Sequence, residues 1–120
     1  MERISFSNIG LSLLVNEFLG RVNDFASQNR YEEVLHECHI FGEYIYHNYH
    51  PRGYSNRSYV NDPLAAVIIA CIVQQHAFKK LNNHDKYERM NPMIETNLNF
   101  LLSGDQKDEL IDVWQIMQRN

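Results

Sequence analysis

Residues 64–73 form the most apolar stretch of this 120-residue chain and constrain its fold more than any other feature. They consist only of leucine, alanine, valine, isoleucine and cysteine, so a helix over them has no polar face. Such a helix must be covered by other elements on several sides. The stretch is well short of the roughly 20 apolar residues that cross a bilayer. It therefore predicts the central helix of a soluble protein.

Local signals suggest where this central helix begins and ends. Asn61-Asp62 followed by Pro63 is typical of an N-cap with proline in the first helical turn. Beyond the apolar stretch, polar residues are expected to bring the helix back to solvent: Gln74, Gln75, Lys79 and Lys80. We therefore predict a helix over about 63–80, preceded by one long loop at 51–62. Loops of that length in compact domains are usually functional or mobile.

Apolar residues at steps of three and four predict further helices on both sides of the central one. Ser7 or Asn8 is a suitable N-cap for the first of them, and Asn91-Pro92 repeats the cap-and-proline signal. Asn82-Asn83-His84 predicts a turn, and no segment shows the period-two alternation of a strand. The expected helices cover residues 8–27, 31–49, 92–102 and 106–118, with a short amphipathic piece over 85–90.

Length and composition place these helices in one domain. The chain is 44% hydrophobic and 22% charged, which are ordinary globular values. A domain of this size buries roughly two-thirds of its unfolded surface and needs neither metal nor disulfide for its core. Cys38 and Cys71 lie within apolar helical patterns and are expected to be buried free thiols. We predict a single all-α domain over residues 1–120, a compact bundle of about five helices around the central one.

Residues 44–59 are the part of the chain whose composition suits binding. They hold five of the seven tyrosines and two of the seven arginines, and aliphatic residues nearly vanish after Ile45. Tyrosine and arginine are enriched where proteins bind partners, because they offer rigid faces and directed donors. We expect a partner to dock at this corner, and the candidate contacts are Tyr46, Tyr49, His50, Arg52, Tyr54 and Arg57.

The charge of the chain indicates what kind of partner to expect. A net charge of −4 favours a cationic partner, and Glu33, Glu37 and Glu43 of the predicted second helix would contribute to its attraction. A nucleic-acid binder usually presents a basic face, whereas Arg52 and Arg57 are the only two arginines at the corner. We therefore expect a protein partner and neither nucleic acid nor membrane.

No motif in the chain points to a reaction or a cofactor. The sequence contains no Gly-rich phosphate loop, no paired cysteine motif and no nucleophile elbow. No apolar signal-peptide core follows Met1, which predicts a cytoplasmic protein. We therefore expect a binding module and not an enzyme, specifically a bacterial-type immunity or antitoxin-like inhibitor. Its partner would be a basic toxin, such as a nuclease, that it neutralises by stoichiometric binding.

A metal-dependent enzyme is the first alternative. His39, Glu43, His47 and His50 follow one another at steps of four, four and three, so all four could share one helical face. The spacing suits zinc or iron ligation. Side chains four residues apart also pair on solvated helix faces without any metal.

Two further alternatives stay open at this point. The spacing Arg30-x5-His36 is similar to the Arg-x4–6-His motif of the helical HEPN ribonucleases. The pair lies early in the chain, however, and Tyr31 occupies the position that is usually polar in that family. The other alternative is a subunit of a larger helical assembly, in which the tyrosine-rich corner would contact another copy. The oligomeric state is left open.

Overall fold

Five helices make up the described part of the chain, which comprises residues 4–7, 9–49 and 57–120, with side chains for all of these except 57–60. Within these ranges the computed structural model contains no strand. The predicted all-α fold is therefore confirmed. The helices are α1 (Ser12–Ser27), α2 (Tyr31–Tyr49), α3 (Arg57–Lys80), α4 (His84–Phe100) and α5 (Asp105–Arg119).

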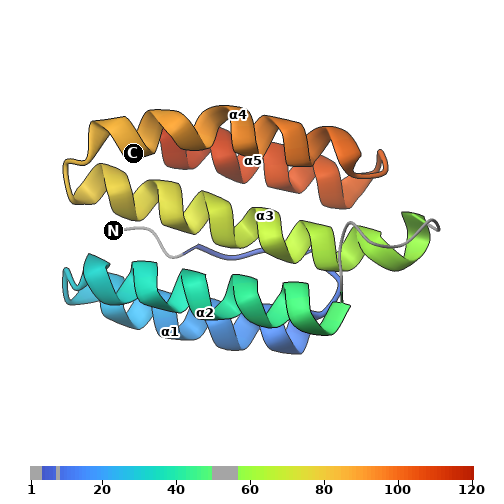
Figure 1. Ribbon diagram of the computed structural model, residues 1–120, viewed down its shortest axis with the longest axis horizontal. Coiled ribbons are helices and arrows are strands. Elements are labelled where there is room, and N and C mark those ends of the chain that lie inside the picture. The colour runs from blue at the N-terminus through green and yellow to red at the C-terminus, as the bar shows by residue number, and fades with distance from the viewer. Residues whose placement is uncertain (1–3, 8, 50–56) are drawn as a thin grey trace.

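The helices pack in two layers, and α3 lies at the centre of the nearer one (Figure 1). α2, α3 and α4 lie in the nearer layer, with α1 behind α2 and α5 behind α4. α1 packs against α2, and α3 packs against α2, α4 and α5. The molecule is elongated along the helices, with principal extents of 39 × 24 × 23 Å.

The predicted central helix is confirmed. Every residue of the stretch 64–73 is buried, because α2, α4 and α5 contact α3 from different directions. Cys38 and Cys71 are both buried and neither is in a disulfide, as expected. None of the helices in the described ranges combines the length and hydrophobicity needed to cross a membrane.

The beginning of α3 differs from the prediction. The helix starts at Arg57, so Pro63 lies inside it and residues 57–62 are helical instead of forming half of the expected loop. Asn61 and Asp62 do not cap the helix, because their side chains make tertiary hydrogen bonds. Asn61 Nδ2 donates to Gln106 Oε1 at 2.8 Å, and Gln106 Nε2 donates to Asp62 Oδ1 at 3.2 Å. These contacts hold the first turns of α3 against α5.

The pattern of a capping Asn followed by proline was also misleading in α4. This helix is continuous from the N-cap Asn83, whose Oδ1 accepts from the Lys86 backbone N–H at 3.3 Å, so Asn91-Pro92 does not begin a new helix. The side chain of Asn91 is held in a buried network and is not used as a cap. The predicted turn at 82–84 is confirmed for its first two residues, and Asn82 adopts a positive φ of 59° there.

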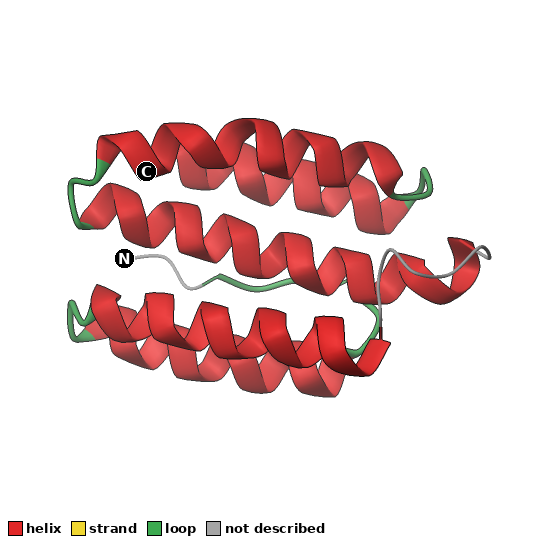
Figure 2. Cartoon of the chain, viewed as in Figure 1, coloured by secondary structure: helices red, strands yellow, loops and turns green. Residues whose placement is uncertain are grey.

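The segment before α1 is not helical, and we call residues 4–7 and 9–11 the N-terminal strap. It runs behind α3, between α1 and α5 (Figures 1 and 2). Its backbone is fixed at two points. Ile4 exchanges two hydrogen bonds of 3.1 Å with the side chain of Asn23 on α1, and Ser7 donates to the carboxylate of Glu109 on α5 at 2.7 to 3.0 Å. The strap therefore occupies the rear layer between α1 and α5, and the helix predicted over 8–27 begins only at Ser12.

A buried polar network centred on Gln75 joins α3, α4 and α5. Gln75 is only 2% exposed, so the prediction that it returns the helix to solvent is wrong. Trp114 Nε1 donates to Gln75 Oε1 at 2.7 Å, while Gln75 Nε2 donates to the Tyr87 carbonyl at 3.0 Å and to Asn91 Oδ1 at 2.7 Å. Gln118 Nε2 also donates to Asn91 Oδ1, at 3.0 Å. The amide of Gln75 thus has a partner for its oxygen and for its nitrogen.

Replacing Gln75→Leu should lower the free energy of unfolding by about 2–3 kcal/mol, because it leaves the buried indole N–H of Trp114 without an acceptor. Urea titration followed by the fluorescence of the single tryptophan measures this directly. Gln74→Leu is the matched control on the next residue of α3, which is partly exposed, and should change stability by less than about 0.5 kcal/mol. Equal losses in the two variants would contradict the role assigned to the network.

Candidate partner-binding groove

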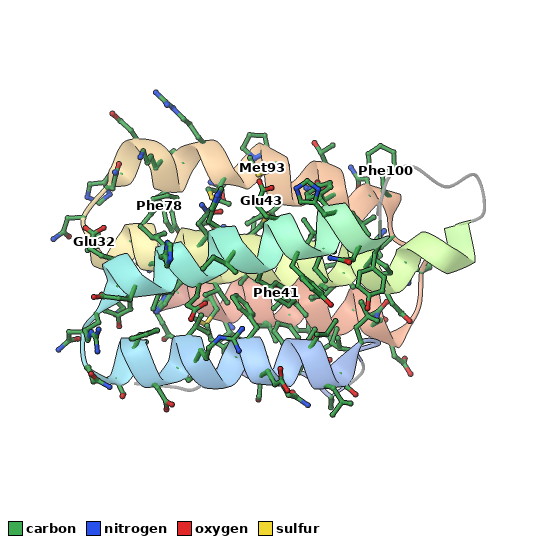
Figure 3. All side chains as sticks on the ribbon, turned by 60° about the horizontal axis from the view of Figure 1, so that its bottom comes forward. Glu32, Phe41, Glu43, Phe78, Met93 and Phe100 are labelled. Carbon is green, nitrogen blue, oxygen red and sulfur yellow. The ribbon has the colours of Figure 1, made fainter. Side chains whose placement is uncertain are left out.

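A groove with a volume of about 200 Å³ lies between α2 and α4, with α3 as its floor. We call it the α2–α4 groove. Figure 3 shows Glu43 of α2 and Met93 of α4 on its facing sides. Its lining residues are Cys38, His39, Gly42, Glu43 and Tyr46 of α2, Val67, Ala70, Cys71 and Gln74 of α3, and Met93 and Asn97 of α4.

The floor of the groove is one face of α3. Val67, Ala70, Cys71 and Gln74 follow the helical spacing that places residues on a single stripe. Val67 and Ala70 are 5% exposed and Cys71 is 8% exposed, whereas every other residue of 64–73 is at most 2% exposed. This stripe is therefore the one face of the apolar stretch that the rest of the described chain does not fully cover.

Small residues keep the groove open. A Cβ atom added to Gly42, in the middle of α2, would meet nothing within 4 Å. Ala70 and Cys71 on the floor have short side chains as well. Glycine inside a helix costs about 0.5–1 kcal/mol relative to alanine, so this opening lowers the stability of α2.

Two large apolar side chains stand at the lips of the groove. Tyr46 of α2 is 40% exposed and Met93 of α4 is 49% exposed. Tyrosine combines a rigid apolar face with a polar tip, and methionine adapts to irregular partners. The groove thus has an apolar floor, adaptable apolar lips and polar groups from Glu43, Gln74 and Asn97.

The three glutamates predicted to bind a partner occupy different surroundings. Only Glu43 lines the groove. Glu37 lies 3.3 Å from Arg21 of α1, and Glu33 lies 3.3 Å from Arg30 in the α1–α2 turn. All of α2 contains four glutamates and no lysine or arginine. The helix therefore contributes negative charge at the groove and on the faces next to it.

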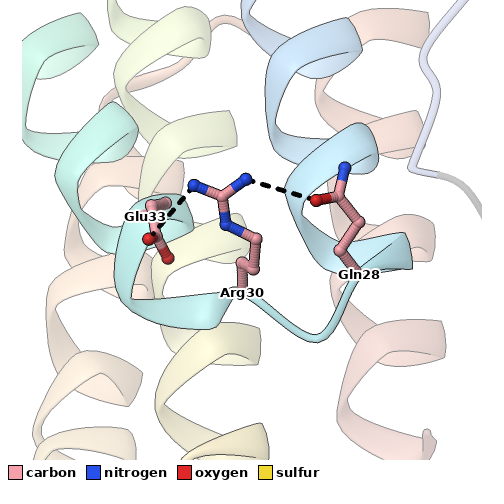
Figure 4. Close-up of polar contacts among 3 residues, drawn as sticks. All are labelled: Gln28, Arg30 and Glu33. Atoms are coloured by element: carbon pink, nitrogen blue, oxygen red, sulfur yellow. Dashed lines mark hydrogen bonds and ion pairs between the residues drawn. The ribbon is translucent and has the colours of Figure 1, made fainter.

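Arg30 stabilises the turn between α1 and α2 (Figure 4). One guanidinium nitrogen donates to Gln28 Oε1 at 3.2 Å and the other to Glu33 Oε1 at 3.3 Å. The guanidinium carbon also lies 4.8 Å from the centre of the Phe25 ring. These contacts give Arg30 a structural role that is independent of the ribonuclease-like spacing with His36.

The tyrosine-rich corner is only partly within the described residues. Tyr46 lies at the groove, and Tyr49 is partly buried, with its ring centre 6.5 Å from that of Tyr44. The structure does not describe His50, Arg52, Tyr54 or the side chain of Arg57, the first residue of α3.

The residues that α3 and α4 contribute to the groove were not predicted from the sequence. They are distant from α2 in the chain and lack a local binding signal.

The histidine spacing on α2 produces a side-chain contact on the surface. Glu43 Oε2 lies 3.2 Å from His47 Nε2, and both side chains are largely exposed. His39 lines the groove, while His50 is outside the described residues. Across the described ranges, no three His, Cys, Asp or Glu side chains are grouped to hold a metal ion. Burial, together with the nearby Cys71 and Glu37, raises the pKa of the Cys38 thiol, so this thiol is neutral.

A second, much smaller cavity surrounds His76 on the other side of α3. It measures about 10 Å³ and is lined by His76, Tyr31 of α2 and Ile4 of the strap, among others. This is close to the smallest volume that holds one water molecule. His76 is buried, and its Nδ1 has no hydrogen-bond partner within the described structure. Burial, with help from Lys80 and Lys79, lowers the pKa of His76 to about 4.

Comparison with known proteins adds no relative from which a function could be transferred. No protein-family model, no curated protein sequence and no solved structure matches the chain.

Gly42→Leu should raise the free energy of unfolding by about 0.5–1 kcal/mol, because the new side chain has open space and removes a glycine from a helix interior. Gly20→Leu is the matched control, since Gly20 lies inside α1 and also has nothing within 4 Å of an added Cβ. It should give a similar gain. Thermal and urea unfolding measure both variants, and a loss of stability in Gly42→Leu would show that the groove is not open.

Acidification should destabilise the protein through His76. Its pKa of about 4 in the folded state lies below its ordinary 6.5, so folding favours the neutral ring. The contribution is complete above pH 6.5 and is lost as the pH falls from 6.5 towards 4. Between about pH 7 and pH 5, the unfolding free energy should fall by about 2 kcal/mol more in the wild type than in His76→Phe. Equal pH dependence of the two proteins would contradict this assignment.

Proposed function

We propose that the protein binds another protein stoichiometrically and that the α2–α4 groove receives the partner. One observation carries the proposal: the lips, Tyr46 and Met93, are exposed above a hollow whose floor is apolar. Protein interfaces are typically anchored by large side chains that fill pockets of this kind. The exposed lips would be covered in such a complex.

The lining of the groove favours a protein over a nucleic acid. It includes Glu43 and, among the described lining residues, neither lysine nor arginine. Nucleic-acid binding depends on neutralising phosphates with such side chains, and an adjacent carboxylate opposes it. The glutamates of α2 would instead attract a cationic protein surface. This attraction would accelerate association.

The specific form of the proposal is a cytoplasmic inhibitor of the immunity or antitoxin type that neutralises a basic toxin such as a nuclease. Glu43 supports the choice of a basic partner, because it lines the groove, whereas Glu33 and Glu37 pair with Arg30 and Arg21. Two buried cysteines that form no disulfide suit a reducing compartment. Neutralisation requires only that the groove and its surroundings cover the partner's active surface.

Affinity capture from native lysate with three tagged proteins tests the proposal. Wild type and Gly20→Leu should retain the same basic protein in a one-to-one complex, and Gly42→Leu should retain about tenfold less of it, because its side chain fills the groove. Quantitative mass spectrometry of the eluates measures the difference.

A purified partner allows the inhibitory role to be examined separately. Its nuclease activity should fall to background at one equivalent of wild type, and Gly42→Leu should require a large excess. Equal capture by all three proteins would show that the groove is not the docking site. A captured partner whose activity is unaffected would contradict inhibition while leaving binding in place.

A further inference from the structure

We propose that the α2–α4 groove takes an amphipathic helix of the partner, with a bulky apolar side chain entering the groove and a lysine or arginine beside it. This inference rests on the proposed function and specifies the chemistry of the binding segment. The backbone hydrogen bonding of the groove walls, the size of the groove and the position of Glu43 support it.

The walls of the groove favour a helix over an extended chain. They are formed by three helices, α2, α3 and α4, whose backbone groups are bonded within each helix. An extended segment would bury its own N–H and C=O groups there without partners, which is costly. A helix satisfies these groups internally and presents only side chains, as in other helix-in-groove complexes.

The N-terminal strap shows what an extended segment needs on this molecule. On the opposite side of α3, both backbone groups of Ile4 bond to Asn23 and the backbone N–H of Ser7 bonds to Glu109. In the α2–α4 groove the buried amide is Asn97, and its Nδ2 already donates to the Met93 carbonyl at 2.9 Å. Two polar groups of the groove lining, Asn97 and Glu43, are therefore already engaged within this chain, whereas Asn23 and Glu109 are used to hold the strap.

The size of the groove defines how such a helix would sit. A volume of about 200 Å³ has room for side chains but not for the body of a helix about 10 Å across. The helix would lie on Tyr46 and Met93, and its apolar residues would point between Gly42 and Ala70. Residues three or four apart on its inner face would then follow the stripe of α3 that forms the floor.

Glu43 supplies the charge that selects a basic helix. It lines the groove and is largely exposed, and on this chain it contacts His47, which is more exposed still. A surface pair of this kind contributes little to stability and can be exchanged for a contact with the partner. No lysine or arginine of α2 competes for the carboxylate.

Three fluorescent peptides of about 16 residues test the inference, a length at which helices begin to form in water. The first is amphipathic with lysine and arginine on its polar face, the second has the same apolar face with glutamate instead, and the third is the basic peptide with a central proline. Anisotropy should show that wild type and Gly20→Leu bind the first at least about tenfold more tightly than the other two.

Two variants locate the contact on the protein. Gly42→Leu should weaken binding of the basic peptide by about tenfold, and Glu43→Gln should weaken it by about threefold without weakening the acidic peptide. Equal binding of the proline peptide, unchanged binding by Gly42→Leu, or no binding of the basic peptide would each overturn the inference. If lysate capture still depends on Gly42 in that case, the proposed function stands and only the helical nature of the ligand is wrong.

Discussion

The need to cover α3 is the constraint on which the rest of the structure depends. Because residues 64–73 have no polar face, every side of this helix must meet another element. α2, α4 and α5 provide three of these contacts, and the N-terminal strap passes along the rear side. Coverage is weakest between α2 and α4, where Val67, Ala70 and Cys71 retain some exposure. The candidate binding site is therefore the place where the packing of the central helix is incomplete.

Apolar burial alone does not fix how α4 and α5 are seated on α3, since smooth apolar faces can pack in several registers. The Gln75 network supplies directed contacts: it ties the indole of Trp114 and the side chain of Asn91 to one position on α3. A buried polar network whose members all have partners favours a single arrangement, because alternatives leave some group unsatisfied. By fixing α4, the network also sets where Met93 and Asn97 stand relative to the groove.

Local patterns in the sequence predicted the elements better than their ends. Apolar periodicity gave the bounds of α2, and the uninterrupted apolar stretch gave the central position of α3. The two Asx-Pro signals failed for a common reason: the Asn and Asp side chains that were expected to cap a helix are held by tertiary hydrogen bonds instead. Cap preferences are local, and contacts between distant segments override them. The strap was missed for the same reason, since its partners Asn23 and Glu109 lie 19 and 102 residues away.

The candidate site was predictable only on the side that α2 contributes. Tyr46 and Glu43 belong to a tyrosine-rich segment and a glutamate-rich helix, so composition revealed them, whereas nothing local marks Val67 or Met93. Gly42 is the instructive case. A glycine in a helix interior lowers stability wherever it occurs, and Gly20 in α1 is just as open without lining the groove. The difference is that Gly42 faces the incompletely covered stripe of α3, where a larger side chain would close the hollow and improve burial. Glycine at that point therefore keeps the groove open at the expense of the stability of α2.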